Sequence, residues 1–290
     1  MLELIVARAD TRTAPGFAGR VARLAVRSLY AELALYPKPG LVSLVDNGSH
    51  QDMNAETFLR SLFALRRYFR DICEAGMEGA PFQELKRLGI GAEQRMLRAT
   101  RGVNTHRGAI FCVGLLCAAI GRCHAQGTPL APAAIRSALL ERWGQALSAH
   151  TADGSVASHG TRAVLRYAAS GAREEAARGL PSVFETGLPA LRRTLAGGRG
   201  MRLARVDALF ALMAQVSDTN VYHRGGLEGA ATVRRHARAF VARGGTGARD
   251  WMATALDSHR HFVARRLSPG GAADLLAAVC LVHAACGGEL

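Results

Sequence analysis

The clearest pattern of apolar and polar positions lies in residues 55–72, where apolar side chains repeat with the period of an α-helix. The apolar stripe consists of Phe58, Leu62, Leu65, Phe69 and Ile72, with Arg60 and Arg67 on the opposite face. Similar runs predict further helices at roughly 17–35, 83–99, 108–121, 131–148, 160–170, 184–196, 202–216, 226–242, 249–266 and 271–286. Runs of alternating β-branched and polar residues are nearly absent, so the predicted fold class is all-α.

The chain is predicted to form a single multi-helix domain over residues 1–290. Its 290 residues would allow about two domains by length alone. However, no Pro/Ser-rich linker, charge block or low-complexity run divides it, and no repeat of 20–50 residues indicates a solenoid. With 49% apolar residues, the chain has enough material for a large core.

The most apolar run, residues 109–121, is too short to span a bilayer and predicts a buried core helix. The start, MLELIVARADTR, lacks the apolar stretch of a signal peptide, so we expect a cytoplasmic protein without a membrane partner. No C-x-x-C pair occurs, and a structural zinc site is not expected. Six cysteines are expected to be reduced and mostly buried: Cys73, Cys112, Cys117, Cys123, Cys280 and Cys286.

The formal net charge of +14, from 37 basic and 23 acidic residues, suggests an anionic partner. Nucleic acids and polyphosphate metabolites both fit, and a coding bias towards arginine would give the same charge without any partner. The basic residues are scattered, and aromatic residues, which stack on bases, make up only 6%. We therefore expect no nucleic-acid partner.

Polar residues gather in four breaks between the predicted helices, at 36–54, 100–108, 217–226 and 268–276. Each break leads into a helix N-terminus, where free N–H groups and the helix dipole favour anions. Neither G-x-x-x-x-G-K-[ST] nor G-x-G-x-x-G occurs. If the four helix ends converge, they would form a phosphate-binding cavity without a P-loop.

The first break is long for a connection inside a compact domain and contains four candidate site residues. Lys38 lies between two prolines that stiffen its backbone, which suits a positive charge aimed at a phosphate. The alternative is a solvated lysine on a rigid turn. Asp52 and Asn54 could both cap the next helix, but one cap needs only one of them. His50, beside these residues, would suit acid–base work near neutral pH.

The second break contributes Asn104, Thr105, His106 and Arg107, which follow a helix that carries Glu93. As a site, these residues would combine an acid, a histidine and a phosphate-binding arginine. The alternative is a surface glutamate followed by a threonine that caps the next helix.

The last two breaks hold Asp218, Asn220, Arg224 and Asp274. Asp218 could form an ordinary Asx turn. Asp274 follows the sequence SPGG, an ordinary helix start, and an acid near such a start is also ordinary. Because carboxylates repel phosphates unless a cation lies between them, the combination favours Mg²⁺ bound with a polyphosphate.

The ordered motifs PKPGLV, NGSHQDMN, GAEQRMLRATRGVNTHRGAIF, SDTNVYHRGG and SPGGAADLL resemble the triphosphoribosyl-dephospho-CoA synthases. The resemblance covers about residues 30–280, and the family is all-α. It implies transfer of the 5-triphosphoribosyl group of ATP to the ribose 2′-hydroxyl of 3′-dephospho-CoA, with release of adenine. The product would be the precursor of the acyl-carrier prosthetic group of malonate decarboxylase or citrate lyase, and a separate transferase would load it.

Two positions depart from the family's usual motifs. Ser43 stands where PKPGLVD is common, with the next acid at Asp46, and this spacing favours the malonate decarboxylase branch. Arg107 stands where a lysine often follows NTH. Arginine keeps the charge but differs from lysine in geometry, so it suits phosphate binding better than amine chemistry.

The resemblance implies the following roles. Catalysis would involve Asp52, Glu93, His50 and His106; substrate or phosphate binding Lys38, Asn104, Thr105, Arg107, Asn220 and Arg224; and Mg²⁺ binding Asp52, Glu93, Asp218 and Asp274. We also expect the segment 36–54 to close over the substrates and exclude water.

Two alternatives stay open from the sequence. A kinase or nucleotidyltransferase acting on a CoA precursor would release ADP or pyrophosphate in place of adenine. A basic helical nucleic-acid-binding protein would bind random oligonucleotides with strong salt dependence.

Overall fold

The computed structural model describes residues 16–152 and 171–290, and these ranges contain helices and no strand. The helices are α1 (Phe17–Leu33), α2 (Ala55–Met77), α3 (Phe82–Ala99), α4 (Arg107–Ala125), α5 (Pro132–Ala152), α7 (Ala172–Ala177), η1 (Ser182–Gly187), α8 (Leu188–Ala196), α9 (Met201–Gln215), α10 (Thr219–Ala242), η2 (Gly245–Gly247), α11 (Trp251–Ala264) and α12 (Gly270–Ala285). The all-α prediction is confirmed. The predicted helix at 160–170 lies outside the described residues.

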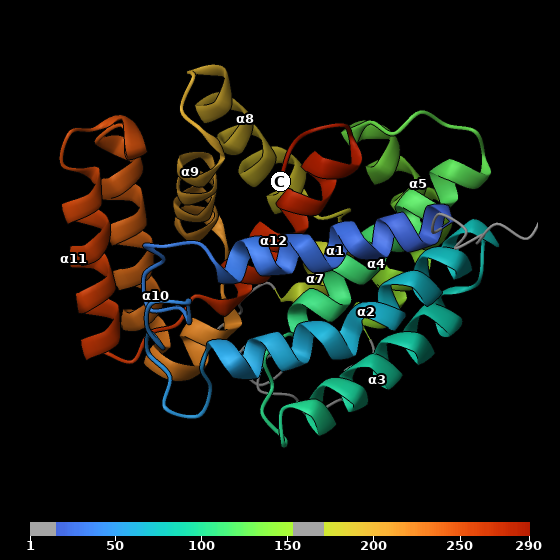
Figure 1. The fold of residues 1–290 in the computed structure, drawn as a ribbon, viewed down its shortest axis with the longest axis horizontal. Coiled ribbons are helices and arrows are strands. Elements are labelled where there is room, and N and C mark those ends of the chain that lie inside the picture. Colours follow the sequence, from blue (N-terminus) through green and yellow to red (C-terminus); the bar gives the residue numbers. More distant parts are fainter. Residues whose placement is uncertain (1–15, 153–170) are drawn as a thin grey trace, which may run out of the picture.

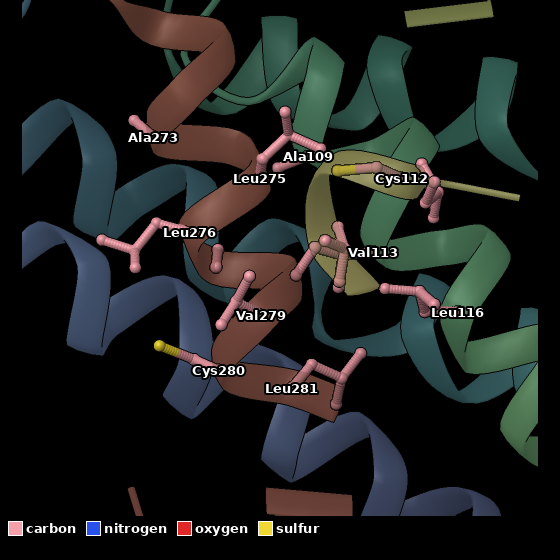
Figure 2. Close-up of a cluster of buried hydrophobic side chains, with 14 of the residues drawn as sticks. Ala109, Cys112, Val113, Leu116, Ala273, Leu275, Leu276, Val279, Cys280 and Leu281 are labelled. Carbon is pink, nitrogen blue, oxygen red and sulfur yellow. The ribbon is translucent and has the colours of Figure 1, made fainter. Parts of the chain in front are cut away.

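Helices α4 and α12 form the centre of the core. Both are apolar around most of their circumference, as expected for helices enclosed by others. Figure 2 shows the contact between them, where Ala109 of α4 lies beside Leu275 of α12, whereas Leu276 and Cys280 point to the other side of α12. Helix α4 is long and apolar enough to cross a membrane, but 72% of that stretch is buried in the protein. The predicted core helix is thus confirmed.

The remaining helices pack in two groups around this centre (Figure 1). Helices α2, α3 and α5 pack near α4, whereas α8, α9 and α10 lie beyond the other side of α12. Helix α1 packs along both α2 and α12. The segment between α1 and α2 reaches across to α10 and α11, which brings Asp46 and Ser49 beside His259 and Leu267.

Besides α7 and η2, which lie where no helix was predicted, two elements differ from the predicted ranges. The predicted helix 226–242 is the second part of α10, which already begins at Thr219. Gly226 interrupts it with φ 60° and ψ −155°, a conformation open to glycine but not to a helical residue. The predicted helix 184–196 is split into the π-helical turn η1 and α8. Both differences are local changes of backbone geometry inside a stretch that is helical on both sides.

The six cysteines are free, and five of them are buried, with Cys286 partly exposed. Their predicted state is therefore confirmed. Burial raises the pKa of the Cys73 thiol to about 12 and that of Cys280 to about 11, so these thiols stay protonated and act as small apolar side chains.

Candidate active site

The helix starts that follow three of the polar breaks meet at two aspartates. The side chain of Asp218 accepts hydrogen bonds from the backbone N–H of Asn220, at 2.9 Å, and of Ala272, at 3.1 Å. It therefore caps α10 and α12 together. The carboxylate of Asp274, from α12, accepts the N–H of Ala109 in α4. The predicted convergence is thus confirmed for α4, α10 and α12.

These helix starts are not open to phosphate in the way the sequence suggested. A Cβ at Gly108 would overlap the carboxylate of Asp274, so that carboxylate lies directly on the first turn of α4. Asp218 likewise occupies N–H groups at the starts of two helices. The positive ends of the helix dipoles therefore already hold the protein's own negative charges. A bound triphosphate would therefore need positively charged partners other than these helix N-termini.

Lys38 is buried, with 1% of its side chain exposed, and its Nζ lies 2.5 Å from Oε1 of Glu32 at the end of α1. This position excludes the solvated lysine that was the alternative. Burial lowers the pKa of Lys38, while the charges of Glu32 and Asp46 oppose that shift. The lysine stem and its partner are therefore fixed inside the protein beneath the convergence of helices.

Glu32, Asp218 and Asp274 form what we call the acidic floor. Burial, followed by the charges of Glu32 and Asp218, raises the pKa of Asp274 well above its ordinary range. Burial also raises the pKa of Asp218, although its backbone hydrogen bonds oppose the change. The acidic floor is thus an arrangement of repelling carboxylates that a nearby cation would stabilise.

His106 lies at the start of α4, with 2% of its surface exposed. Its Nδ1 is 2.7 Å from the hydroxyl of Ser61, and its ring packs edge-on against Phe58. Burial, with a further effect of the Lys38 charge, lowers the pKa of His106 to about 3. The imidazole is therefore neutral at physiological pH. The Nε2 of His106 and the buried hydroxyl oxygen of Thr105 have no hydrogen-bond partner among the described residues.

A first rim beside the acidic floor joins the 36–54 segment to α10 and α12. The Nε2 of His50 lies 2.8 Å from the Ser268 hydroxyl, and its Nδ1 lies 3.1 Å from Arg224. Asp52 is 3.6 Å from the same Nδ1 and keeps 61% of its side chain exposed. Burial and the Arg224 charge lower the pKa of His50. Asn54, and not Asp52, caps α2, so Asp52 is free for another role.

A second rim lies at the start of α4. Arg107 forms an ion pair with Glu93 of α3, with Nε 2.6 Å from Oε1. The side chain of Asn104 accepts the N–H of Arg107, the first residue of α4, at 3.1 Å, whereas the Thr105 hydroxyl has no hydrogen bond among the described residues. Glu93 is therefore not an isolated surface acid, because it orients Arg107.

The 36–54 segment has a buried part and an exposed part. Residues 37–43 are buried, and a Cβ at Gly40 would overlap the carbonyl oxygen of Leu267. The hydroxyl of Ser49 donates to the same carbonyl at 2.6 Å. By contrast, Leu44 and Val45 are 49% and 65% exposed. A closing motion is therefore restricted to the exposed tip and does not involve Lys38.

The structure does not bring the four predicted metal ligands into one set. Asp218 and Asp274 lie in the acidic floor. Asp52 lies on the first rim beside His50, and Glu93 lies on the second rim in an ion pair with Arg107. Among the described residues, no group of three or more acidic, histidine or cysteine side chains could hold a metal ion by itself. The carboxylate oxygens still suit Mg²⁺, because this ion commonly takes one or two carboxylates and completes its shell with phosphate oxygens and water.

Two residues of this region were not singled out from the sequence. Glu32 falls on the buried stripe of α1 with Ala25 and Leu29, and an acid on an apolar stripe is a signal for a buried partner. Ser61 gives no such signal, since a small polar residue on a buried helix face is common. Its role depends on His106, 45 positions later in the chain.

Residues 18–289 match the family described as ATP:dephospho-CoA triphosphoribosyl transferase. The chain belongs to this family. It is similar, with 40% identity over 89% of this chain and 88% of the relative, to a protein of Acinetobacter calcoaceticus named probable 2-(5''-triphosphoribosyl)-3'-dephosphocoenzyme-A synthase. A protein of Azotobacter vinelandii with the same name is 42% identical over 91% of this chain and 90% of its own. A protein of Pectobacterium atrosepticum, named 2-(5''-triphosphoribosyl)-3'-dephosphocoenzyme-A synthase, is 38% identical over 88% of this chain and 86% of its own length.

No solved structure gives a significant match to the chain. The matches confirm the resemblance that the five motifs indicated. As a member of this transferase family, the chain is a triphosphoribosyl-dephospho-CoA synthase, and the segments that carry the motifs are those that meet at the acidic floor and its two rims.

Proposed function

We propose that this transferase family member binds ATP with Mg²⁺ above the acidic floor and transfers the 5-triphosphoribosyl group to the 2′-hydroxyl of 3′-dephospho-CoA, releasing adenine. The observation that supports this location is the meeting of three helix starts at Asp218 and Asp274. Mg²⁺ would be held by these two aspartates together with phosphate oxygens, and it would neutralise charge between carboxylates and triphosphate.

The reaction develops positive charge on the ribose C1 and ring oxygen as the bond to adenine breaks. A carboxylate facing that centre stabilises the charge, as in glycoside hydrolysis. The acceptor hydroxyl must lose its proton to a general base, and an exposed carboxylate at the rim suits this step. Asp52 and Glu93 are the two acids placed there, one on each rim.

Arg107 and Arg224 are the cations that the two rims offer to the triphosphate. Both keep exposed surface, unlike Lys38, and both are oriented by neighbouring groups. Lys38 would act indirectly, because its charge offsets that of Glu32 beneath the metal. His50 and Asn220 would orient the ribose, since His50 lies on the first rim and the Asn220 side chain lies against Gly270 at the start of α12.

The direct test is mass spectrometry of one reaction. Purified protein is mixed with ATP, Mg²⁺ and 3′-dephospho-CoA, and free adenine and the triphosphoribosyl adduct are measured. Adenine and adduct in equal amounts, dependent on the acceptor, are the expected result. ADP or pyrophosphate without adenine would instead indicate phosphoryl or nucleotidyl transfer. Tight binding to random oligonucleotides with no reaction would favour the nucleic-acid alternative.

Variants then test the assignment of the rim acids. Asp52→Asn and Glu93→Gln should lower the rate about 10²–10⁴-fold for whichever acid is the general base, with the melting temperature unchanged. Glu84→Gln is a matched control, since Glu84 also lies on α3 and pairs with an arginine, Arg87, far from the acidic floor. Full activity in both rim variants would refute the assignment.

We further propose that the product serves malonate decarboxylase and is passed to a separate transferase that loads the acyl-carrier subunit, in the cytoplasm. Support comes from the PKPGLVS motif. The hydroxyl of Ser43 accepts the N–H groups of Val45 and Asp46, both at 3.1 Å, and shapes the turn at the position where the family motif often has an acid. The genes beside this one test the proposal, because citrate lyase subunits there would contradict it.

A further inference from the structure

Arg224 is held by three neutral acceptors at the first rim. Its Nη1 donates to the backbone carbonyl oxygens of Ser49, at 3.2 Å, and of Arg266, at 3.4 Å. Its Nη2 lies 3.1 Å from Nδ1 of His50. The side chain is exposed and, in the part of the chain that the structure describes, it has no carboxylate partner. The positive charge of Arg224 is therefore fixed in place without being neutralised.

Arg224 also determines which nitrogen of His50 carries the ring proton. A guanidinium has N–H donors and no acceptor, so the Nδ1 that it contacts must be the unprotonated nitrogen. The proton then lies on Nε2, 2.8 Å from the hydroxyl of Ser268, whose oxygen accepts it. Asp52 lies 3.6 Å from Nδ1, too far for a hydrogen bond, and does not displace Arg224. Both ring nitrogens are therefore used by the protein.

Ser268 uses its hydroxyl for this contact and not for the helix that follows. A serine just before a helix commonly caps it. The N-cap residue of α12, however, is Pro269, which makes no side-chain cap, and Asp218 accepts the N–H of Ala272 in the first turn. Ser268 is 3% exposed, and its partner His50 lies 218 positions earlier in the chain. The buried serine thus holds the imidazole from the side opposite Arg224.

We propose that Ser268 and His50 are positioning residues for Arg224, which they hold so that its remaining N–H groups bind the triphosphate of ATP. The inference rests on the proposed function. The three acceptors of Arg224 use three of its five N–H groups and leave that of Nε and one of Nη2. N–H groups on these neighbouring nitrogens can bind two phosphate oxygens at once. Because the triphosphate is carried on the ribose, a fixed Arg224 also orients the ribose.

Calorimetry with inorganic triphosphate and Mg²⁺ tests this role without any turnover. Ser268→Ala should weaken binding about 3–10-fold, as expected for the loss of one hydrogen bond, and His50→Leu at least as much. His50→Asn keeps an acceptor near the Nδ1 position and should recover part of the affinity. The matched control Ser258→Ala removes a hydroxyl from His236, between α10 and α11, and should bind like wild type. Wild-type affinity in both Ser268→Ala and His50→Leu would overturn the proposal.

Steady-state kinetics separate the positioning role from acid–base catalysis by His50. In Ser268→Ala and His50→Asn, the KM for ATP should rise with the dissociation constant of triphosphate, while kcat stays within about threefold of wild type, because a contact made equally with substrate and transition state affects KM alone. Arg224→Lys should raise the KM at least about 10-fold although it keeps the charge. A fall in kcat of about 10²–10⁴-fold in His50→Asn, with unchanged triphosphate affinity, would indicate acid–base catalysis and overturn the proposal.

Nitrogen NMR of the wild-type imidazole needs no variant. His50 should show an unprotonated Nδ1 and a protonated Nε2, both with and without triphosphate and Mg²⁺, and a protonated Nδ1 would overturn the inference. The failure of the proposed function is a separate outcome. Adenine release from ATP by a wild-type protein that does not bind triphosphate would leave the function intact and overturn the inference. Without adenine release the proposed function falls, and the triphosphate titrations still decide the role of Ser268 and His50.

Discussion

Replacing Lys38 with methionine tests the view that the buried ion pair with Glu32 holds the acidic floor together. Methionine keeps most of the lysine's volume but removes its charge. With 1% and 6% of the two side chains exposed, the pair lies in the regime where removing one partner costs about 3–5 kcal/mol. In a protein of this size that corresponds to a fall in melting temperature of roughly 6–20 °C.

The surroundings make the two single variants unequal. Lys38→Met leaves the Glu32 carboxylate unpaired beside Asp218 and Asp274, so repulsion adds to desolvation. Glu32→Leu leaves the lysine near the remaining acids, including Asp46, which also attracts it. Lys38→Met should therefore be the more destabilising of the two, and the double variant should be more stable than Lys38→Met alone.

Urea denaturation of both single variants and the double variant gives the coupling energy of the pair. We expect a coupling energy of at least about 2 kcal/mol, because removing only one member of a buried pair leaves an uncompensated charge. The exposed pair Arg60–Glu56 on α2, 2.7 Å apart, is the control and should show about 0.3–0.5 kcal/mol. Additive effects at Lys38 and Glu32 within about 0.5 kcal/mol would refute this account.

Three further changes have definite expected results. Burial and neighbouring carboxylates raise the pKa of Asp274, so its contribution to stability is present below about pH 4 and is lost as the pH rises through the raised pKa. In urea titrations without Mg²⁺, the Asp274→Asn variant should therefore gain stability relative to wild type between pH 5 and 8. A difference in stability that stays constant over this pH range would contradict this. Gly40→Ala, at φ 72° and against the Leu267 carbonyl, should cost about 2–4 kcal/mol of unfolding free energy, and Gly200→Ala, with open space around it, should cost much less. Chymotrypsin should cut after the exposed Leu44, and ATP with Mg²⁺ should protect that bond if the tip closes; unchanged cleavage would argue against a lid.

The helices could be predicted from the sequence because their apolar periodicity is strong. The predicted range 83–99 corresponds to α3, Phe82–Ala99, and the range 271–286 to α12, Gly270–Ala285. The sequence also indicated a break near Gly226, but it did not predict that α10 already begins before this glycine, at Thr219. Two adjacent glycines disfavour helix locally. That the chain is nevertheless helical on both sides of them is decided by packing against the rest of the protein.

The site was predictable as a set of segments but not as a set of partners. The breaks do converge, yet Asp218 and Asp274 turn out to occupy helix starts that were expected to bind phosphate. Which acceptor fills a helix start depends on contacts between residues such as Asp274 and Ala109, which lie far apart in the chain. Likewise, the exposure of Lys38 could not be read from its two flanking prolines, because its partner Glu32 belongs to the preceding helix.

The buried cysteines, whose thiols are protonated, can be used to detect local opening of the protein by their reaction with a thiol reagent. Cys73 in α2, Cys117 in α4 and Cys280 in α12 cannot react with a thiol reagent until the helices around them separate. The partly exposed Cys286 should react first and supply the baseline. The order in which the others become labelled would show whether the α4–α12 centre opens as one cooperative unit or whether helices detach one at a time, with no label introduced by mutation.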